Sequence, residues 1–162
     1  MVSLKYRILQ SNYADSALAE RDILQQVAQS GLTPVRMAFF TDVANNEDYL
    51  AQWERIVSLC NEIFAECKPM VVLIAQPPLN ARLLAEVTYV EDDCKIVYNN
   101  DYIVINDYQI FSGGLFSAQD ASIGSKAERV FERLHEILKT EGFAINDIVR
   151  QWNYIEHITH IS

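Results

Sequence analysis

Two segments far apart in this chain resemble each other, and this repeat constrains the fold more than any other feature of the sequence. One reads V-R-M-A-F-F-T-D-V from Val35, and the other reads V-R-Q-W-N-Y-I-E-H from Val149. Each follows a stretch of helical character that contains A-E-R and then a glycine, Gly31 or Gly142. A helix followed by an apolar strand, used twice, predicts that the chain contains parts of two similar helix–strand units.

The length and composition predict one compact domain. The chain has 162 residues and a hydrophobic content of 50%. A single domain of this size buries roughly 70% of its extended surface, whereas two halves of about 80 residues would each lie near the limit for an independent core. We therefore expect a single domain over residues 1–162.

The charge balance excludes several classes of partner. Acidic residues outnumber basic ones by 22 to 13, which gives a net charge of −9 and predicts no nucleic-acid partner, because phosphate contacts need Lys and Arg. The same charge predicts no membrane partner, and no apolar stretch resembles a membrane span or a signal peptide. Three cysteines without C-x-x-C spacing disfavour a disulfide framework. We expect a cytoplasmic protein.

Hydrophobic periodicity and turn signals predict about seven strands and three helices. The expected helices cover residues 16–30, 47–66 and 126–141. The expected strands cover residues 2–9, 35–41, 71–75, 83–90, 95–98, 102–111 and 148–158. Because helices this amphipathic need a sheet to cover, the sequence predicts an α+β fold with a mixed six- to seven-stranded sheet and the helices packed on one face.

Several short motifs resemble those of the YjgF/RidA superfamily, which has a chorismate-mutase-like fold. They are F-S-G-G at 111–114, the passage from Gly142 to N-D-I-V at 146–149, and K-P at 68–69. Residues 16–90 resemble the later half of the family's unit and residues 94–158 its early half, so the halves stand in swapped order. A permuted single unit and a piece of a longer tandem protein both account for this order.

The resemblance implies a fold and a class of activity. Members of the family lay two helices across a six-stranded sheet, usually form trimers, and bind small carboxylate metabolites in clefts between subunits. RidA-like members hydrolyse imines or enamines and use an arginine to hold the substrate carboxylate. This chain has K-P-M-V at 68–71 in the corresponding place, so that arginine is missing. Whether the chain is an enzyme, a hydrolase or deaminase, therefore stays open.

Two other functions remain open beside this one. R-Q-W-N-Y-I at 150–155 is similar to a strand of chorismatases, larger enzymes built from two such units, so a chorismatase-like hydrolase or a fragment of one is an alternative. The missing arginine favours a binding or structural module without catalysis. The family's older association with RNA cleavage gains no support from an acidic chain.

The resemblance also implies candidate site residues. Glu86 matches the family's water-orienting glutamate, and a solvent-facing position on a half-buried strand is the alternative. Ser112 and Gly113 match an S-G pair that lines the ligand cleft, and a strand end that needs the conformational freedom of glycine is the alternative. Tyr98 matches a tyrosine ahead of the family's hairpin, and it also fits an ordinary aromatic strand residue.

Three further candidates lie on the second copy of the repeat. Arg150, Trp152 and Tyr154 share one face of the expected strand, where stacking and cation–π contacts with an aromatic carboxylate contribute about 1–2 kcal/mol each. A salt bridge from Arg150 to a neighbouring strand is the alternative. Arg82 is another possible anion contact.

The sequence predicts no metal and no cofactor. His157 and His160 are three residues apart on an expected strand, which places them on opposite faces. The chain contains no glycine-rich phosphate loop, no nucleophile elbow and no H-E-x-x-H. Cys67 lies on the apolar stripe of its helix, which favours a packed thiol over a reactive one.

Overall fold

The computed structural model describes residues 2–91, 93–115 and 122–154. The chain forms two compact units, unit 1 (Met1–Gly114) and unit 2 (Leu115–Ser162). The expectation of a single domain over residues 1–162 stays a prediction.

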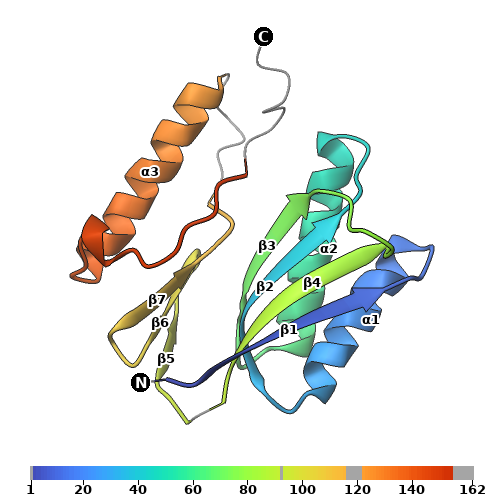
Figure 1. Cartoon of the computed structure of the whole chain (residues 1–162), viewed down its shortest axis with the longest axis horizontal. Coiled ribbons are helices and arrows are strands. Elements are labelled where there is room, and N and C mark those ends of the chain that lie inside the picture. The colour runs from blue at the N-terminus through green and yellow to red at the C-terminus, as the bar shows by residue number, and fades with distance from the viewer. Residues whose placement is uncertain (1, 92, 116–121, 155–162) are drawn as a thin grey trace. The chain divides into compact units, whose positions relative to one another are not determined.

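Unit 1 contains two helices and two sheets (Figure 1). Its elements are β1 (Leu4–Ser11), α1 (Ser16–Gln29), β2 (Thr33–Thr41), α2 (Asn46–Ile63), β3 (Met70–Ala75), β4 (Leu83–Val90), β5 (Ile96–Tyr98), β6 (Tyr102–Ile105) and β7 (Gln109–Ser112). Unit 2 contains α3 (Ile123–Thr140) and the short 3-10 helix η1 (Ile145–Asp147). The α+β class predicted from the sequence is confirmed.

The larger sheet is mixed and has the strand order β1-β4-β2-β3. β2 runs parallel to β3, whereas β4 lies between β1 and β2 and runs antiparallel to both. The register places Leu83, the first residue of β4, opposite both Ser11 and Thr41. The ends of β1 and β2 therefore meet the start of β4 at one edge of the sheet, and α1 and α2 begin just beyond that edge.

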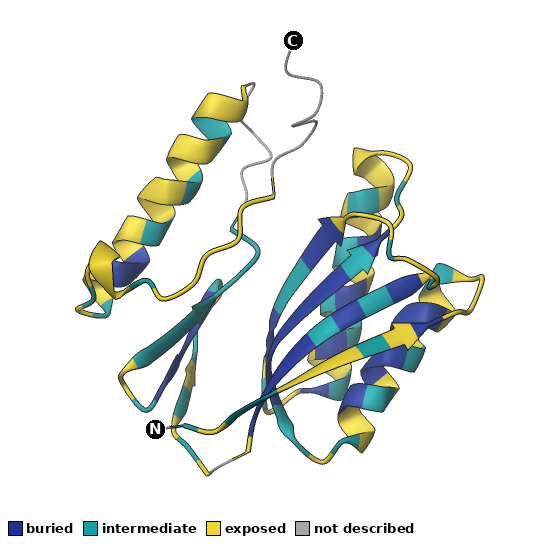
Figure 2. Ribbon diagram, in the orientation of Figure 1, coloured by how far each residue is buried: buried dark blue, intermediate teal, exposed yellow. Residues whose placement is uncertain are grey.

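Helices α1 and α2 cover one face of the larger sheet, and the main core lies between these two layers (Figure 2). The apolar side chains of α1 recur at helical spacing and so lie on one face of the helix. Alternate residues of the strands point toward this face. The fully buried members of this core include Ala19, Ile23, Leu24, Val27, Met37, Phe39, Ile56, Ala85, Val87 and Tyr89. Each large apolar side chain buried here contributes about 1.5–3 kcal/mol relative to an exposed one.

The expectation of one six- to seven-stranded sheet is wrong, because β5, β6 and β7 form a separate three-stranded sheet. Every residue of β6 is buried, so this strand has two apolar faces. Its Ile103 and Ile105 pack with Val35, Met70 and Val90 on the face of the larger sheet that points away from α1 and α2. The hairpin sheet therefore covers this face of the larger sheet with its apolar side chains and does not add strands to it.

The predicted strand over residues 102–111 is also wrong, because the chain reverses inside it. Asn106 and Asp107 have φ angles of 51° and 62°, a left-handed conformation that these two residue types tolerate better than most. The Asn106 side chain accepts a hydrogen bond from the backbone N–H of Lys95 (2.9 Å), and Lys95 Nζ contacts Asp107 Oδ1 (2.8 Å). β6 and β7 are therefore the two arms of a hairpin.

In unit 2, α3 ends as α1 does, at a glycine of positive φ. Gly31 and Gly142 have φ angles of 68° and 77°. After α3, the backbone N–H of Phe143 donates to the carbonyl of Leu138 (2.8 Å), the pattern of a Schellman cap. After α1, the backbone N–H of Leu32 instead donates to the hydroxyl of Ser30 (3.2 Å), so the two copies of the repeat share the positive φ of the glycine but not the cap.

The strand predicted at 148–158 is wrong for residues 148–154, which have no regular secondary structure. A strand needs a partner strand for its backbone groups, and the described residues of unit 2 contain only α3 and η1. Residues 155–158 of that prediction, and His157 and His160, lie outside the described residues.

Candidate functional site

Glu86, the candidate catalytic carboxylate, lies on β4 on the sheet face that points away from the helices. Its Oε1 lies 3.2 Å from Nη1 of Arg36 on β2, and the side chains of Arg36 and Glu86 are 11% and 36% exposed. Glu86 shares this face with Leu84 and Thr88, as the strand alternation predicts. The ion pair with Arg36 gives Glu86 a structural role, and the catalytic role of Glu86 stays a prediction.

Tyr98 is a half-buried residue of β5. Burial and, to a lesser extent, the nearby thiols of Cys67 and Cys94 together raise the pKa of its phenol to about 12. Burial likewise raises the pKa of Cys67, which packs against the main core, in agreement with a packed thiol. A phenol with a pKa of this size donates a hydrogen bond at neutral pH and is not a base there.

Ser112 and Gly113 follow each other at the end of β7. The Ser112 hydroxyl donates to the carbonyl of Asp101 (3.1 Å), and the backbone N–H of Gly113 donates to the same oxygen (3.4 Å). A Cβ atom at Gly113 would lie only 2.7 Å from Cγ2 of Val72 on β3. Close packing against β3 therefore requires glycine here, whereas the positive φ of this segment belongs to Gly114.

Arg150, Trp152 and Tyr154 lie in unit 2. The guanidinium of Arg150 stacks over the Trp152 ring, with Cζ 4.2 Å from the ring centroid. Residues 148–154 do not form the strand whose face these side chains are expected to share, and their role in binding stays a prediction. Trp152 and Tyr154 are exposed. In unit 1, no hydrogen bond or ion pair among the described residues joins Glu86 to Tyr98 or to Ser112.

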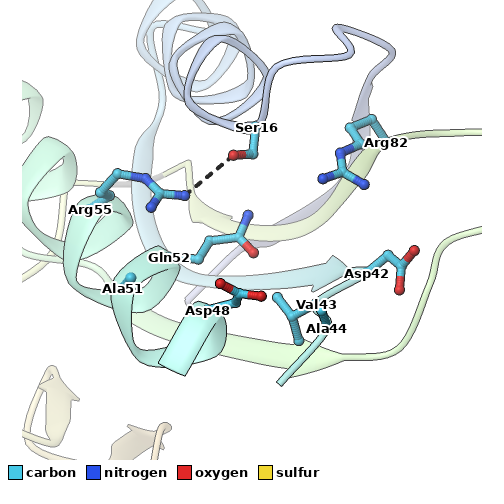
Figure 3. A pocket seen from close by; sticks show the side chains of 9 residues that line it. All are labelled: Ser16, Asp42, Val43, Ala44, Asp48, Ala51, Gln52, Arg55 and Arg82. Carbon is cyan, nitrogen blue, oxygen red and sulfur yellow. Dashed lines mark hydrogen bonds between the residues drawn. The ribbon is translucent and has the colours of Figure 1, made fainter. Parts of the chain in front are cut away.

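A different group of polar side chains in unit 1 surrounds a cleft of about 430 Å³ (Figure 3). Its polar lining consists of Ser16, Asp42, Asp48, Gln52, Arg55 and Arg82. Val43, Ala44 and Ala51 form its apolar lining. Of the candidate residues named from the sequence, only Arg82, a possible anion contact, is among the described residues that line it.

The topology explains why these residues meet. The ends of β1 and β2 lead into α1 and α2, so Ser16 at the start of α1 faces the first turns of α2. Arg82 directly precedes β4, and its backbone N–H donates to the carbonyl of Ser11 (3.0 Å) at the end of β1. The N-cap Asn45 fixes the start of α2, because its side chain accepts from the backbone N–H of Asp48 (2.9 Å).

A buried chain of hydrogen bonds holds the floor of the cleft. Glu20 of α1 has no exposed surface, and both of its carboxylate oxygens accept hydrogen bonds from Arg55, at 3.2 Å and 2.9 Å. Gln52 Nε2 donates to Glu20 Oε1 (3.0 Å), and the hydroxyl of Thr41 donates to Gln52 Oε1 (3.0 Å). These mutual bonds fix the rotamers of Gln52 and Arg55 before any ligand arrives.

Arg55 joins this buried chain to the open cleft. Its hydrogen bond to Glu20 raises its pKa, although burial lowers it in part, and its Nη2 also lies 3.4 Å from the hydroxyl of Ser16. The side chain is 42% exposed, so one side of the guanidinium pairs with Glu20 and the rest faces solvent.

The opposite side of the cleft carries charged groups that have no partner within the described part of the chain. Figure 3 shows Arg82 and Asp42 on the side away from Arg55, with Gln52 and Asp48 between the two sides. Neither Arg82 nor Asp42 makes a side-chain hydrogen bond or ion pair with a described residue. Asp48 Oδ2 accepts from the amide of Asn45 (3.0 Å).

These side chains suit recognition better than covalent chemistry. Two guanidinium groups, a hydroxyl and an amide are donors that bind a carboxylate. Ser16, the only hydroxyl among the described residues of the lining, contacts Arg55 rather than a histidine or carboxylate base. Among the described residues, no group of three or more His, Cys, Asp or Glu side chains has the arrangement of a metal site.

The sequence interpretation missed Glu20, Gln52 and Arg55, although it noted Arg82. One signal was available, because Glu20 and Gln52 lie on the faces of α1 and α2 that carry the apolar stripes. A charged or amide side chain at such a position needs a buried partner. The equivalent of Glu20 in the second A-E-R is Glu128 on α3, which is exposed.

Comparison of the chain with models of known protein families, with curated proteins and with solved structures finds no match. The site must therefore be interpreted from its own chemistry. Within the described ranges, no helix has the length and apolarity required to cross a bilayer.

Proposed function

We propose that this protein binds a small carboxylate metabolite in the cleft between the first turns of α1 and α2. The observation that carries the proposal is the pair Arg55 and Arg82, which face one cleft of about 430 Å³ from different elements. A planar guanidinium holds a carboxylate through two parallel hydrogen bonds. Ser16 and Gln52 add neutral polar contacts beside it.

The surroundings of the two arginines support a small ligand. The cleft volume lies in the range of metabolite sites. The chain's net charge of −9 opposes an extended polyanion, which would need many cationic contacts. Gln52 is buried and already held by Thr41 and Glu20, so the floor of the site is in place before binding.

Calorimetric titration with 4-methyl-2-oxopentanoate, a branched 2-oxo acid, tests this proposal. Arg82→Gln removes a cation without disturbing the buried chain, and we expect it to weaken binding about 10-fold or more. Arg21→Gln, which removes an exposed cation outside the cleft on α1, serves as the matched control and should leave the affinity unchanged. Equal affinity in both variants contradicts the proposal.

A second candidate is hydrolysis of an imine or enamine at Glu86, as the resemblance to the YjgF/RidA superfamily implies. The ion pair between Arg36 and Glu86 favours it, because a guanidinium from β2 stands beside the candidate carboxylate although Lys68-Pro69 lacks the family's arginine. The kinship itself, and the trimer that it implies, remain proposals. Support for them comes from the two helices that cover one face of a mixed sheet.

An assay of imine hydrolysis with Glu86→Gln tests this candidate. A rate above background that Glu86→Gln abolishes supports it, whereas a background rate in the unmodified protein removes it.

Light scattering measures the oligomer independently of activity. Thermal shift with benzoates addresses the chorismatase-like alternative, because Arg150 stacked on Trp152 is the surface that an aromatic carboxylate would contact.

A further inference from the structure

The charges in the cleft constrain the ligand beyond its carboxylate. Glu20 neutralises the charge of Arg55, because both oxygens of this fully buried carboxylate accept hydrogen bonds from the guanidinium. Among the described residues of the lining, Arg82 is thus the single cation without a buried counter-ion, and Asp42 and Asp48 also line the cleft. A purely anionic ligand would meet two carboxylates for each cation that remains available, which weakens its binding.

The two aspartates offer acceptors on the cleft wall. Asp42 makes no side-chain hydrogen bond or ion pair with any described residue. Asp48 uses Oδ2 for the amide of Asn45, and its Oδ1 has no bonded partner in the described ranges. Figure 3 shows both aspartates below Ser16 and Arg82 in the view, so donors for an anion and acceptors for a cation line different parts of the cleft.

The apolar part of the lining lies beside the aspartates, and Figure 3 shows Val43 and Ala44 between Asp48 and Asp42 in the view. Val43 and Ala44 follow Asp42 directly, and Ala51 lies between Asp48 and Gln52 on α2. A ligand with its carboxylate near Arg82 and its ammonium near the aspartates would set an aliphatic side chain against these residues. This arrangement matches a free amino acid better than a simple acid or a simple amine.

We propose that the ligand is a small zwitterion, an α-amino acid with an aliphatic side chain, whose carboxylate meets Arg82 and Ser16 and whose ammonium meets Asp42 and Asp48. This inference rests on the proposed function, since it assigns the ligand of the same cleft. It adds a contact between the ligand's ammonium and the two aspartates, which distinguishes an amino acid from the 2-oxo acid of the same carbon skeleton.

The test compares by calorimetry three ligands that share an isobutyl group: L-leucine, 4-methyl-2-oxopentanoate and 3-methylbutylamine. We expect L-leucine to bind about 10-fold or more tightly than either of the others, because only it has both a carboxylate for Arg82 and an ammonium for the aspartates. In Asp42→Asn, which keeps the shape and removes a negative charge, the preference for L-leucine over the oxo acid should fall several-fold. Glu62→Gln, an exposed charge further along α2, is the matched control and should preserve the preference.

The outcomes separate the two proposals. Equal affinity for L-leucine and the oxo acid, or a preference that Asp42→Asn leaves intact, overturns the zwitterion while carboxylate binding stands. Binding of none of the three ligands at about 10 mM overturns the proposed function and the zwitterion with it. An unchanged melting temperature of Asp42→Asn shows that the folded protein was compared.

Discussion

Arg55 and Glu20 form an ion pair with two hydrogen bonds, from Nε to Oε2 at 3.2 Å and from Nη2 to Oε1 at 2.9 Å, across the contact between α1 and α2. The environments of the two partners differ. The Glu20 side chain has no exposed surface, whereas that of Arg55 is 42% exposed. If the pair breaks, the arginine can turn to water, but the carboxylate cannot.

This asymmetry gives the first testable expectation. Arg55→Ala leaves a buried carboxylate without its cation and should lower the free energy of unfolding by about 3–5 kcal/mol. Glu20→Ala leaves a guanidinium that rehydrates and one unsatisfied amide on Gln52, so we expect about 1–3 kcal/mol. Urea denaturation measures both. A larger loss in Glu20→Ala than in Arg55→Ala would contradict this account of the pair.

The second expectation concerns the buried bond between Thr41 and Gln52. Thr41→Val keeps the side-chain shape but leaves the buried Gln52 Oε1 without its donor, so we expect a loss of about 1–3 kcal/mol in urea denaturation. Thr33→Val, at the half-buried start of the same strand, is the matched control and should change stability by less than about 0.5 kcal/mol. Similar losses in the two variants would show that the buried bond is not what stabilises the cleft floor.

Gly113 gives a third expectation, which concerns the contact between β7 and β3. In Gly113→Ala the new Cβ would lie 2.7 Å from Cγ2 of Val72, a stiff β-branched side chain, so we expect a loss of about 1–3 kcal/mol. Val72→Ala removes the opposing methyl groups, and in that background the effect of Gly113→Ala should shrink. A double-mutant cycle in urea measures this coupling, and strict additivity would refute the close approach.

The fourth expectation is a loss of stability at alkaline pH. Burial raises the pKa of Cys60 from 9.0 to about 12. Above about pH 9 the unfolded chain therefore loses its thiol proton while the folded protein keeps it, which favours unfolding. The contribution is fully present below pH 9 and is lost between about pH 9 and 12.

Urea denaturation at increasing pH checks this sign. Cys60→Ala should be less stable below about pH 9, because it leaves a cavity, but its stability should fall less steeply above that pH. Tyr98, whose pKa burial raises to about 12, contributes in the same direction at higher pH, and Tyr98→Phe should flatten that part of the profile. Identical slopes in all three proteins would contradict the burial of these groups.

Much of the fold could be predicted because local patterns specify it. The apolar stripes of α1 and α2 and the alternation of β4 identify faces that must be buried, and the structure places them around one core. Gly31 and Gly142 mark helix ends in the sequence, and both adopt the left-handed conformation that ends a helix. These features depend on residues close together in the chain.

The remaining features depend on long-range packing that periodicity does not encode. The sequence between Tyr102 and Phe111 alternates as a strand does, yet a turn at Asn106 and Asp107 divides it. Residues 148–154 repeat the V-R of β2 and contain two aromatic and two β-branched residues. A strand also requires a partner, which their own unit does not supply among its described residues. Composition indicates that a segment suits a sheet, and not which sheet it joins.

The cleft could not be predicted from the sequence for the same reason. Ser16, Gln52 and Arg82 are far apart in sequence and belong to no motif, and only the arrangement of β1, β2 and β4 brings them together. The residues chosen by motif are spread over two sheets of unit 1 and over unit 2. Glu20, a glutamate on the apolar face of a helix, was the sequence signal for a buried ion pair beside this cleft.

Amide chemical-shift mapping by NMR, with 4-methyl-2-oxopentanoate and L-leucine as ligands, tests the central claim most directly. The account expects the largest shifts at Ser16, Gln52 and Arg82, with little change at Glu86. Shifts that centre instead on Glu86 and Arg36, or no shift at saturating ligand, would contradict a binding site at this end of the sheet.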